Sequence, residues 1–199
     1  HVYHIEAAKK TSGADCIVAV MSGNFLQRGE PAIIDKYSRT RAALQSGVDL
    51  VIELPYLYAV QNSDIFARGA VSILHEAGVS TICFGSESGE ISNFKESYRA
   101  IQKNKATYDT ELAARLDEGL SFPDANKYAY RAIGASSGID LTKPNNILGF
   151  SYIKAIYEQM LPVDPLTIKR KNNQFHDTTL TGNIASATSI RKQLLNEKN

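Results

Sequence analysis

Short apolar runs alternate along this chain with longer stretches in which apolar residues recur every three or four positions. The runs that are apolar almost throughout predict buried strands at 15–21, 49–54, 81–85 and 166–170. The amphipathic stretches predict helices, most clearly at 36–45, from Asn62 or Ser63 to about 77, and from Pro144 onward. Apolar strands separated by helices are typical of βαβ units. We therefore predict an α/β fold with a parallel sheet flanked by helices.

The segment from about 90 to 135 has a helical pattern throughout. Leu112, Leu116 and Leu120 form one apolar stripe in it, and Pro123 is expected to break the pattern. We interpret this segment as a helical insertion within a single domain that covers residues 1–199.

The composition excludes several classes of function but does not identify one. The chain has 199 residues, 43% hydrophobic and 22% charged, with a formal net charge of +1, so it does not bind nucleic acid through bulk positive charge. Any RNA partner must be held by local patches or by chain not present here. Cys16 and Cys83 each lie in an apolar run without zinc-like spacing, and both are expected to be buried. No apolar run approaches the roughly 18 residues that a membrane span needs, and we expect a cytoplasmic protein without a membrane partner.

Ligands of open parallel sheets bind beyond the carboxyl ends of the strands. Here those positions follow Met21, Leu54, Phe84 and Arg170, and three of the four carry polar or glycine-bearing sequence. The longest such loop runs from Ser22 to Pro31, and its glycines allow close approach to a ligand. Its candidate binding residues, with the first lysine of the next helix, are Ser22, Asn24, Gln27, Arg28 and Lys36. An ordinary strand-to-helix loop with a solvated basic helix face is the alternative.

Two further features suggest phosphate or metal chemistry. Ser186 and Thr188 begin a predicted helix, and Arg191 follows about one turn later; free N–H groups and the helix dipole would favour a phosphate there. A capped surface helix is the alternative. His1 and His4, spaced by three, face the same way on a helix, either as part of a metal site without an evident third ligand or as ordinary helix histidines. We expect no dedicated metal site.

These segments together resemble the H-x-G-H nucleotidylyltransferase superfamily, whose C-terminal I-S-x-T-x-x-R motif matches residues 185–191. The block Ser22–Ala32, with 49–55, 144–149 and 168–170, resembles more narrowly the bacterial tRNA(Met) cytidine acetate ligases. The resemblance implies a Rossmann-like fold. It also implies that His1 is the last histidine of the signature, so that one upstream strand and a downstream tRNA-associated region lie outside this chain.

The resemblance implies a two-step reaction. ATP and acetate would form acetyl-adenylate and pyrophosphate, and the acetyl group would then pass to N4 of the wobble cytidine in elongator tRNA(Met). His1 and Arg191 would be the catalytic residues, and Mg²⁺ a partner of ATP. The implied ATP-binding residues are His1, Val2, Tyr3, His4, Gly85, Asn146, Arg170, Lys171, Ser186, Thr188 and Arg191.

Two other functions remain open at this point. A plain adenylyltransferase acting on a small phosphorylated acceptor would share the same two motifs. A non-catalytic module that binds ATP or tRNA would also explain them, and would lose binding but no turnover when His1 or Arg191 is replaced.

Overall fold

The structure of the chain is a computed structural model that describes residues 2–134 and 139–170. Residues 1–169 form one compact unit, and residues 170–199 form a second. His1 and the segments 135–138 and 171–199 lie outside the described residues.

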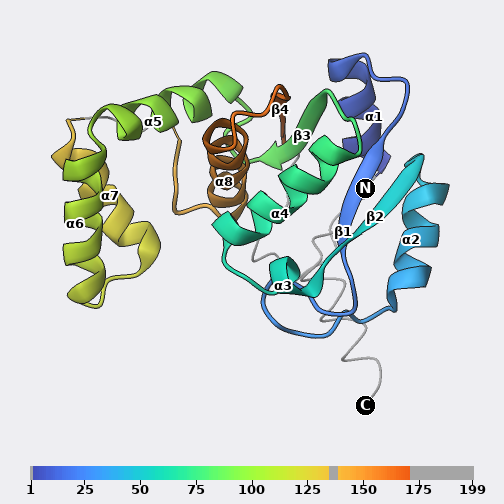
Figure 1. Cartoon of the computed structure of the whole chain (residues 1–199), viewed down its shortest axis with the longest axis horizontal. Coiled ribbons are helices and arrows are strands. Elements are labelled where there is room, and N and C mark those ends of the chain that lie inside the picture. The colour runs from blue at the N-terminus through green and yellow to red at the C-terminus, as the bar shows by residue number, and fades with distance from the viewer. Residues whose placement is uncertain (1, 135–138, 171–199) are drawn as a thin grey trace. The chain divides into compact units, whose positions relative to one another are not determined.

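The first unit alternates strands and helices, as Figure 1 shows. The α/β class with parallel strands flanked by helices is confirmed, and the predicted strands differ from the observed ones by at most three residues at either end. The elements are α1 (Val2–Ser12), β1 (Val18–Ser22), α2 (Lys36–Gln45), β2 (Leu50–Leu54), α3 (Tyr56–Ala59), α4 (Ser63–Glu76), β3 (Thr81–Ser86), α5 (Ile91–Lys103), α6 (Lys105–Asp117), α7 (Phe122–Ala132), α8 (Pro144–Glu158) and β4 (Asp164–Lys169).

The described strands pair two by two, and both pairs are parallel. Strand β1 pairs with β2, with Ser22 opposite Leu54 at their carboxyl ends. Strand β3 pairs with β4, with Ser86 opposite Lys169 at theirs. The carboxyl ends of the two strands of a pair therefore lie side by side, which is the arrangement that a shared binding site requires.

Helices α4 and α8 pack on each other and on the strands (Figure 1). Helix α4 contacts β1 and β2, whereas α8 contacts β3 and β4. The Asn62 side chain caps α4 by accepting the backbone N–H groups of Asp64 and Ile65, each at 3.1 Å. The Asp64 carboxylate reaches α8, where it accepts from the Ser151 hydroxyl at 2.7 Å and the Lys154 ammonium at 2.6 Å. These contacts fix the angle at which α4 crosses onto α8.

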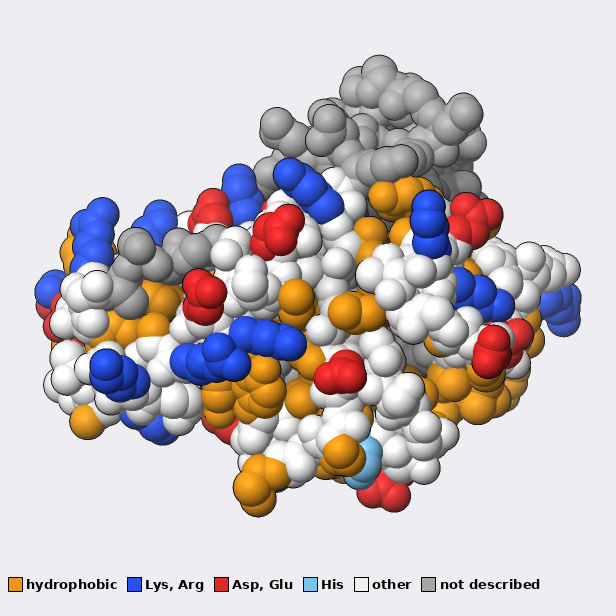
Figure 2. Space-filling model, turned by 90° about the horizontal axis from the view of Figure 1, so that it is seen from above, with side chains coloured by type: hydrophobic (Ala, Val, Ile, Leu, Met, Phe, Trp, Pro, Cys, Tyr) orange, Lys and Arg blue, Asp and Glu red, His pale blue; other side chains and the backbone are white. Residues whose placement is uncertain are grey.

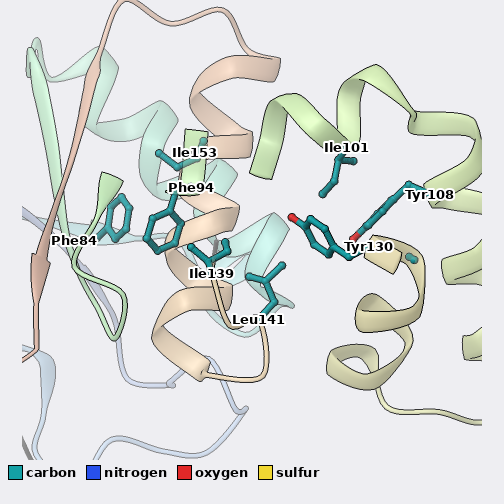
Figure 3. Close-up of a cluster of buried hydrophobic side chains, with 9 residues drawn as sticks. Phe84, Phe94, Ile101, Tyr108, Tyr130, Ile139, Leu141 and Ile153 are labelled. Atoms are coloured by element: carbon teal, nitrogen blue, oxygen red, sulfur yellow. The ribbon is translucent and has the colours of Figure 1, made fainter. Parts of the chain in front are cut away.

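The largest buried cluster lies between β3, α5 and α8 and continues into α6 and α7 (Figure 3). Phe84 of β3 and Phe94 of α5 meet edge to face, with ring centroids 5.4 Å apart. Gly149 of α8 faces this pair, and a Cβ atom there would lie 2.5 Å from the Phe84 ring. The glycine therefore sets how closely α8 approaches β3.

Residues 91–132 contain three helices, but their packing differs from the predicted stripe. Leu112 packs against the largest buried cluster. Leu116 is 40% exposed and Leu120 follows the end of α6, so the three leucines do not form one buried stripe. The buried residue of α6 is Tyr108, whose hydroxyl donates to Asn126 of α7. Pro123 lies in the first turn of α7, where proline is tolerated because its missing N–H would have no partner, so it begins a helix rather than breaking one.

The prediction that both cysteines are buried was wrong for one of them. Cys16 precedes β1 and is exposed, whereas Cys83 lies within β3 and is partly buried. Burial raises the pKa of the Cys83 thiol to about 11. Across the described ranges, no helix is long and apolar enough to cross a membrane.

Replacing Phe94 with alanine should lower the free energy of unfolding by about 3–5 kcal/mol, because a large cavity would form in a fully buried site. Chemical denaturation measures the loss. Phe122→Ala is the matched control, because Phe122 is 47% exposed, and should cost less than about 1 kcal/mol. Equal losses would contradict the assignment of Phe94 to the core.

The two cysteines should differ in reactivity. At pH 8 about one Cys83 side chain in a thousand carries the thiolate, which follows from its pKa of about 11. Iodoacetamide should therefore modify exposed Cys16 first, with Cys83 reacting only as the pH rises or the protein unfolds. Peptide mass spectrometry after timed labelling checks this order, and faster labelling of Cys83 would contradict it.

Candidate functional site

The predicted site residues that the structure describes lie mainly in two groups, one at the carboxyl end of each strand pair. The first group follows β1 and β2 and includes the loop from Ser22 to Pro31. The second lies at the carboxyl ends of β3 and β4 and includes Gly85 and Asn146.

The loop after β1 is a compact turn held by its own backbone. Ala32 N–H donates to the Asn24 carbonyl and Leu26 N–H to the Glu30 carbonyl, both at 2.9 Å. Gly29 closes the turn with a φ of +76°, a conformation that favours glycine. Asn24 and Arg28 are exposed at its surface, and Gln27 is half-buried. The polar residues predicted for binding are thus presented on an ordered loop.

Arg39 of α2 fixes the start of this loop. One terminal nitrogen of its guanidinium donates to the Ser22 carbonyl at 2.8 Å and to the Gly23 carbonyl, and its Nε donates to the Ile34 carbonyl at 3.2 Å. Helix α2 is itself capped by Asp35, whose carboxylate accepts the Ser38 N–H at 2.9 Å. This hydrogen bond lowers the pKa of Asp35. The helix and the loop are therefore positioned together.

Lys36 pairs with a residue that the sequence reasoning missed. Its ammonium donates to the Glu53 carboxylate of β2 at 2.7 Å, and this hydrogen bond is the main cause of the raised pKa of Lys36. The charge of Lys36, a predicted binding residue, is thus matched by Glu53. The signal available in the sequence was a single acid inside the otherwise apolar run 50–54.

A pocket of about 220 Å³ opens beside Glu53. Leu54 and Ala59 are each 1% exposed and form its apolar part. The rings of Phe25 and Tyr56 meet edge to face with centroids 5.6 Å apart. The pocket is lined by Gly23, Asn24, Phe25, Glu53, Leu54, Tyr56 and Ala59.

Asn146 ties the second group together from the first turn of α8. Its side-chain oxygen accepts the backbone N–H groups of Glu87 and Ser88, both at 3.0 Å, and its side-chain nitrogen donates to the Asp140 carbonyl at 3.0 Å. In return, the Glu87 carboxylate accepts the Asn146 N–H at 2.9 Å and the Asn145 amide at 2.7 Å. An anion at the amino end of α8 is favoured by the helix dipole. Asn146, which is 2% exposed, thus positions the loop after β3.

The same loop lies across the end of β4. The Ser86 hydroxyl is 2.7 Å from the Thr167 hydroxyl and accepts the Gly89 N–H at 2.9 Å. Gly89 has a φ of +73°, and a Cβ atom there would lie 2.5 Å from the Lys169 side chain. Gly85 lies opposite Ile168 in the register. The backbone after β3 is thus held in one conformation next to β4.

The remaining predicted residues lie outside these two groups or outside the described residues. Val2 and Tyr3 are 50% and 38% exposed on α1, and His4 on the same helix is half-buried. Arg170 directly follows β4 and is exposed. The predicted residues outside the described ranges are His1, Lys171, Ser186, Thr188 and Arg191.

Charges of both signs are interspersed on the face shown in Figure 2, in keeping with the net charge of +1. Within residues 2–134 and 139–170, no group of three or more His, Cys, Asp or Glu side chains is placed to hold a metal ion.

Comparison with known proteins places this geometry in a family. A family model described as HIGH Nucleotidyl Transferase matches residues 1–199. The chain belongs to the HIGH nucleotidyl transferase family. The tRNA(Met) cytidine acetate ligase of Oceanobacillus iheyensis is 58% identical over 196 residues, which are 98% of this chain and 49% of the relative. The corresponding ligase of Bacillus subtilis is 49% identical over an alignment of 201 residues that covers 99% of this chain and 48% of the relative.

Two crystal structures of Thermotoga maritima TmcAL share the fold. The apo form superposes with a TM-score of 0.89 at 41% identity, covering 100% of this chain and 48% of that protein. The form bound with alpha-thio ATP gives a TM-score of 0.86 at 38% identity, covering 100% and 47%. This member of the HIGH nucleotidyl transferase family therefore spans about half the length of the curated relatives and of the solved structures that it matches.

Asn146→Ala should loosen the loop after β3, because three hydrogen bonds from a buried amide would be lost. We expect the free energy of unfolding to fall by about 1–3 kcal/mol, and the backbone amides of Glu87 and Ser88 to exchange with deuterium faster than in the native protein. Hydrogen-exchange mass spectrometry on the peptide that contains them is the measurement.

The control is Asn93→Ala, because Asn93 contacts the same loop only through a 3.5 Å interaction with the Ser88 hydroxyl. It should leave exchange at Glu87 and Ser88 nearly unchanged. Native exchange rates in Asn146→Ala would show that the loop is held by other contacts.

Proposed function

We propose that this chain supplies the ATP-using catalytic part of a tRNA(Met) cytidine acetate ligase. The activity joins acetate to N4 of the wobble cytidine of elongator tRNA(Met), with ATP converted to AMP and pyrophosphate. The observation that carries the proposal is the 58% identity to such a ligase over 98% of the chain. The similarity to a homologue bound with alpha-thio ATP supports the use of ATP.

In the first step a carboxylate oxygen of acetate attacks the α-phosphorus of ATP. The new P–O bond gives acetyl-adenylate, and the bond to pyrophosphate breaks with its electron pair leaving on pyrophosphate. Negative charge builds on the phosphate oxygens, so the site needs positioned donors more than a covalent nucleophile. We assign this role to His1 and Arg191. The other residues assigned to ATP are Val2, Tyr3, His4, Gly85, Asn146, Arg170, Lys171, Ser186 and Thr188.

The second group of site residues supports part of this assignment. Gly85, the residue before the last of β3, has no side chain, so a nucleotide can approach the backbone there. Asn146 holds the loop that follows Gly85, because its side-chain amide is hydrogen-bonded to the backbone of Glu87, Ser88 and Asp140. Its contribution to ATP binding is therefore the position of the Glu87–Ser88 backbone. Arg170, exposed after β4, is available to the phosphates.

Mg²⁺ belongs to the proposal as a partner of ATP. Since no cluster of metal-ligating side chains exists among the described residues, the ion would be held mainly by the phosphates and water, as Mg²⁺ commonly is in nucleotide sites. It would neutralise phosphate charge when bound. Because the proposed substrate is a tRNA, the proposal includes a cytoplasmic location.

The test is acetate-dependent exchange of labelled pyrophosphate into ATP by the full-length protein. We expect exchange with acetate and none without it. Arg191→Ala should lower the exchange rate by about 10²-fold or more, as loss of a donor to developing charge does. Arg115→Ala is the matched control, because Arg115 contacts Glu111, Glu118 and the Tyr128 ring rather than a predicted site residue. Its exchange rate should stay native.

Deleting the gene gives an independent result. N4-acetylcytidine should disappear from elongator tRNA(Met), measured by nucleoside mass spectrometry, and return on complementation. Unchanged acetylcytidine would overturn the proposal. If the protein instead transfers the adenylyl group of ATP to a small phosphorylated acceptor without acetate, the function is that of a plain adenylyltransferase.

A further inference from the structure

We propose that the pocket beside Glu53 binds the acceptor cytosine and that the Glu53 carboxylate takes the proton from its N4 amine during acetyl transfer. The inference rests on the proposed function and deepens it, because it assigns the second half-reaction to described residues. It is carried by four observations: a small pocket, an aromatic wall, a carboxylate at its edge and a glycine that makes room for that carboxylate.

The size and lining of the pocket suit a single base. Its volume of about 220 Å³ lies below the roughly 300–1,000 Å³ typical of pockets for drug-sized ligands. Leu54 and Ala59 supply a buried apolar surface, while the ring of Tyr56 is 60% exposed and that of Phe25 40% exposed. Exposed aromatic rings beside a pocket are the usual means by which proteins stack a base that has left its neighbours.

The charge of the pocket selects among ligands. Among the described residues that line it, Glu53 is the one that carries a charge. Lys36 already donates to one of its two carboxylate oxygens at 2.7 Å. An anion such as acetate or a phosphate would face a carboxylate there. An amino group would instead find an acceptor, and the N4 amine of cytosine is the base amine that Glu and Asp side chains recognise. The chemistry therefore points to a cytosine rather than to acetate or ATP.

Gly23 makes the geometry possible. A Cβ atom at this position would overlap the second carboxylate oxygen of Glu53, so only glycine leaves space for the carboxylate in its present place. Arg39 holds the Gly23 carbonyl from the other side. The carboxylate thus lies between the Lys36 ammonium and the loop backbone, with its side chain 51% exposed to the ligand side and to solvent.

Acetyl transfer replaces the acyl–phosphate bond of acetyl-adenylate with an amide bond to N4. The N4 lone pair attacks the carbonyl carbon of acetyl-adenylate and forms the amide C–N bond. The bond between that carbon and the phosphate oxygen breaks, and AMP leaves with the electron pair. The surplus proton on N4 passes to the Glu53 carboxylate and then to water, while Lys36 stabilises the carboxylate before and after the transfer.

The first experiment separates the two half-reactions in full-length protein. Glu53→Gln should keep acetate-dependent pyrophosphate exchange within about twofold of native, yet slow acetyl transfer from labelled acetate to elongator tRNA(Met) by about 10²-fold or more. Asp109→Asn is the matched control, because Asp109 pairs with Lys105 at 2.5 Å on an exposed face of α6. It should leave both half-reactions native.

A purely structural ion pair predicts a different outcome. In that case Lys36→Met and Glu53→Gln would lower the melting temperature together and would impair exchange and transfer equally. The proposal instead expects transfer to be slowed much more by Glu53→Gln than by Lys36→Met, because the proton acceptor remains in the second variant.

The aromatic wall gives an independent readout. Tyr56→Ala should raise the apparent KM for tRNA by about tenfold, the low end of what loss of one stacked base costs, with pyrophosphate exchange unchanged; Tyr56→Phe should restore the native KM. Native transfer in Glu53→Gln, or loss of exchange equal to the loss of transfer, would overturn the inference. Absence of exchange in the native protein would instead overturn the proposed function.

Discussion

The packing of α4 on α8 is the contact on which the rest of the described structure depends. The strands form two separate parallel pairs, and each of these helices contacts a different pair. Ala67 and Val71 of α4 meet Ala155 and Ile156 of α8 in a cluster whose members are at most 6% exposed. Small side chains at this crossing let the helices approach closely. The hydrogen bonds of Asp64 to α8 then fix the crossing, and with it the position of one strand pair relative to the other.

Much of this arrangement could be predicted from the sequence because it depends on local patterns. The helix at 36–45 has its predicted bounds, and Asn62 caps α4 as its side chain suggested. The pairing of strands and the insertion could not be predicted in the same way. Which residue of α6 is buried depends on the partner helix. The buried residue is Tyr108, which pairs with Asn126 of α7, rather than one of the leucines. Cys16 lies in an apolar run but before the first residue of β1, so its burial depended on a strand boundary that hydropathy does not locate.

The candidate site was predictable to a similar extent. The polar residues that follow the apolar strands lie at the carboxyl ends of the two strand pairs, as the pattern predicted; ligand binding there stays a prediction. The roles of individual residues depended on three-dimensional contacts that spacing does not contain. Asn146, predicted from resemblance to touch ATP, is buried and holds a loop, and Glu53, 17 positions from Lys36 in the chain, emerged only when β2 and α2 were placed together. A lone acid in an apolar strand was the usable signal, because burying a charge is costly unless it has a partner or a function.

The anchoring of the first loop by Arg39 has a consequence for how the site responds to its surroundings. A guanidinium keeps its proton at every pH a cell reaches, so its bonds to the Ser22 and Gly23 carbonyls do not weaken as histidines titrate. A lysine in its place would present a compact ammonium rather than a planar fork, and would hold three carbonyls less well. The edge that carries Glu53 is therefore built on a fixed charge. A change in pH can alter the protonation of side chains at this edge, while the backbone that positions them keeps its conformation.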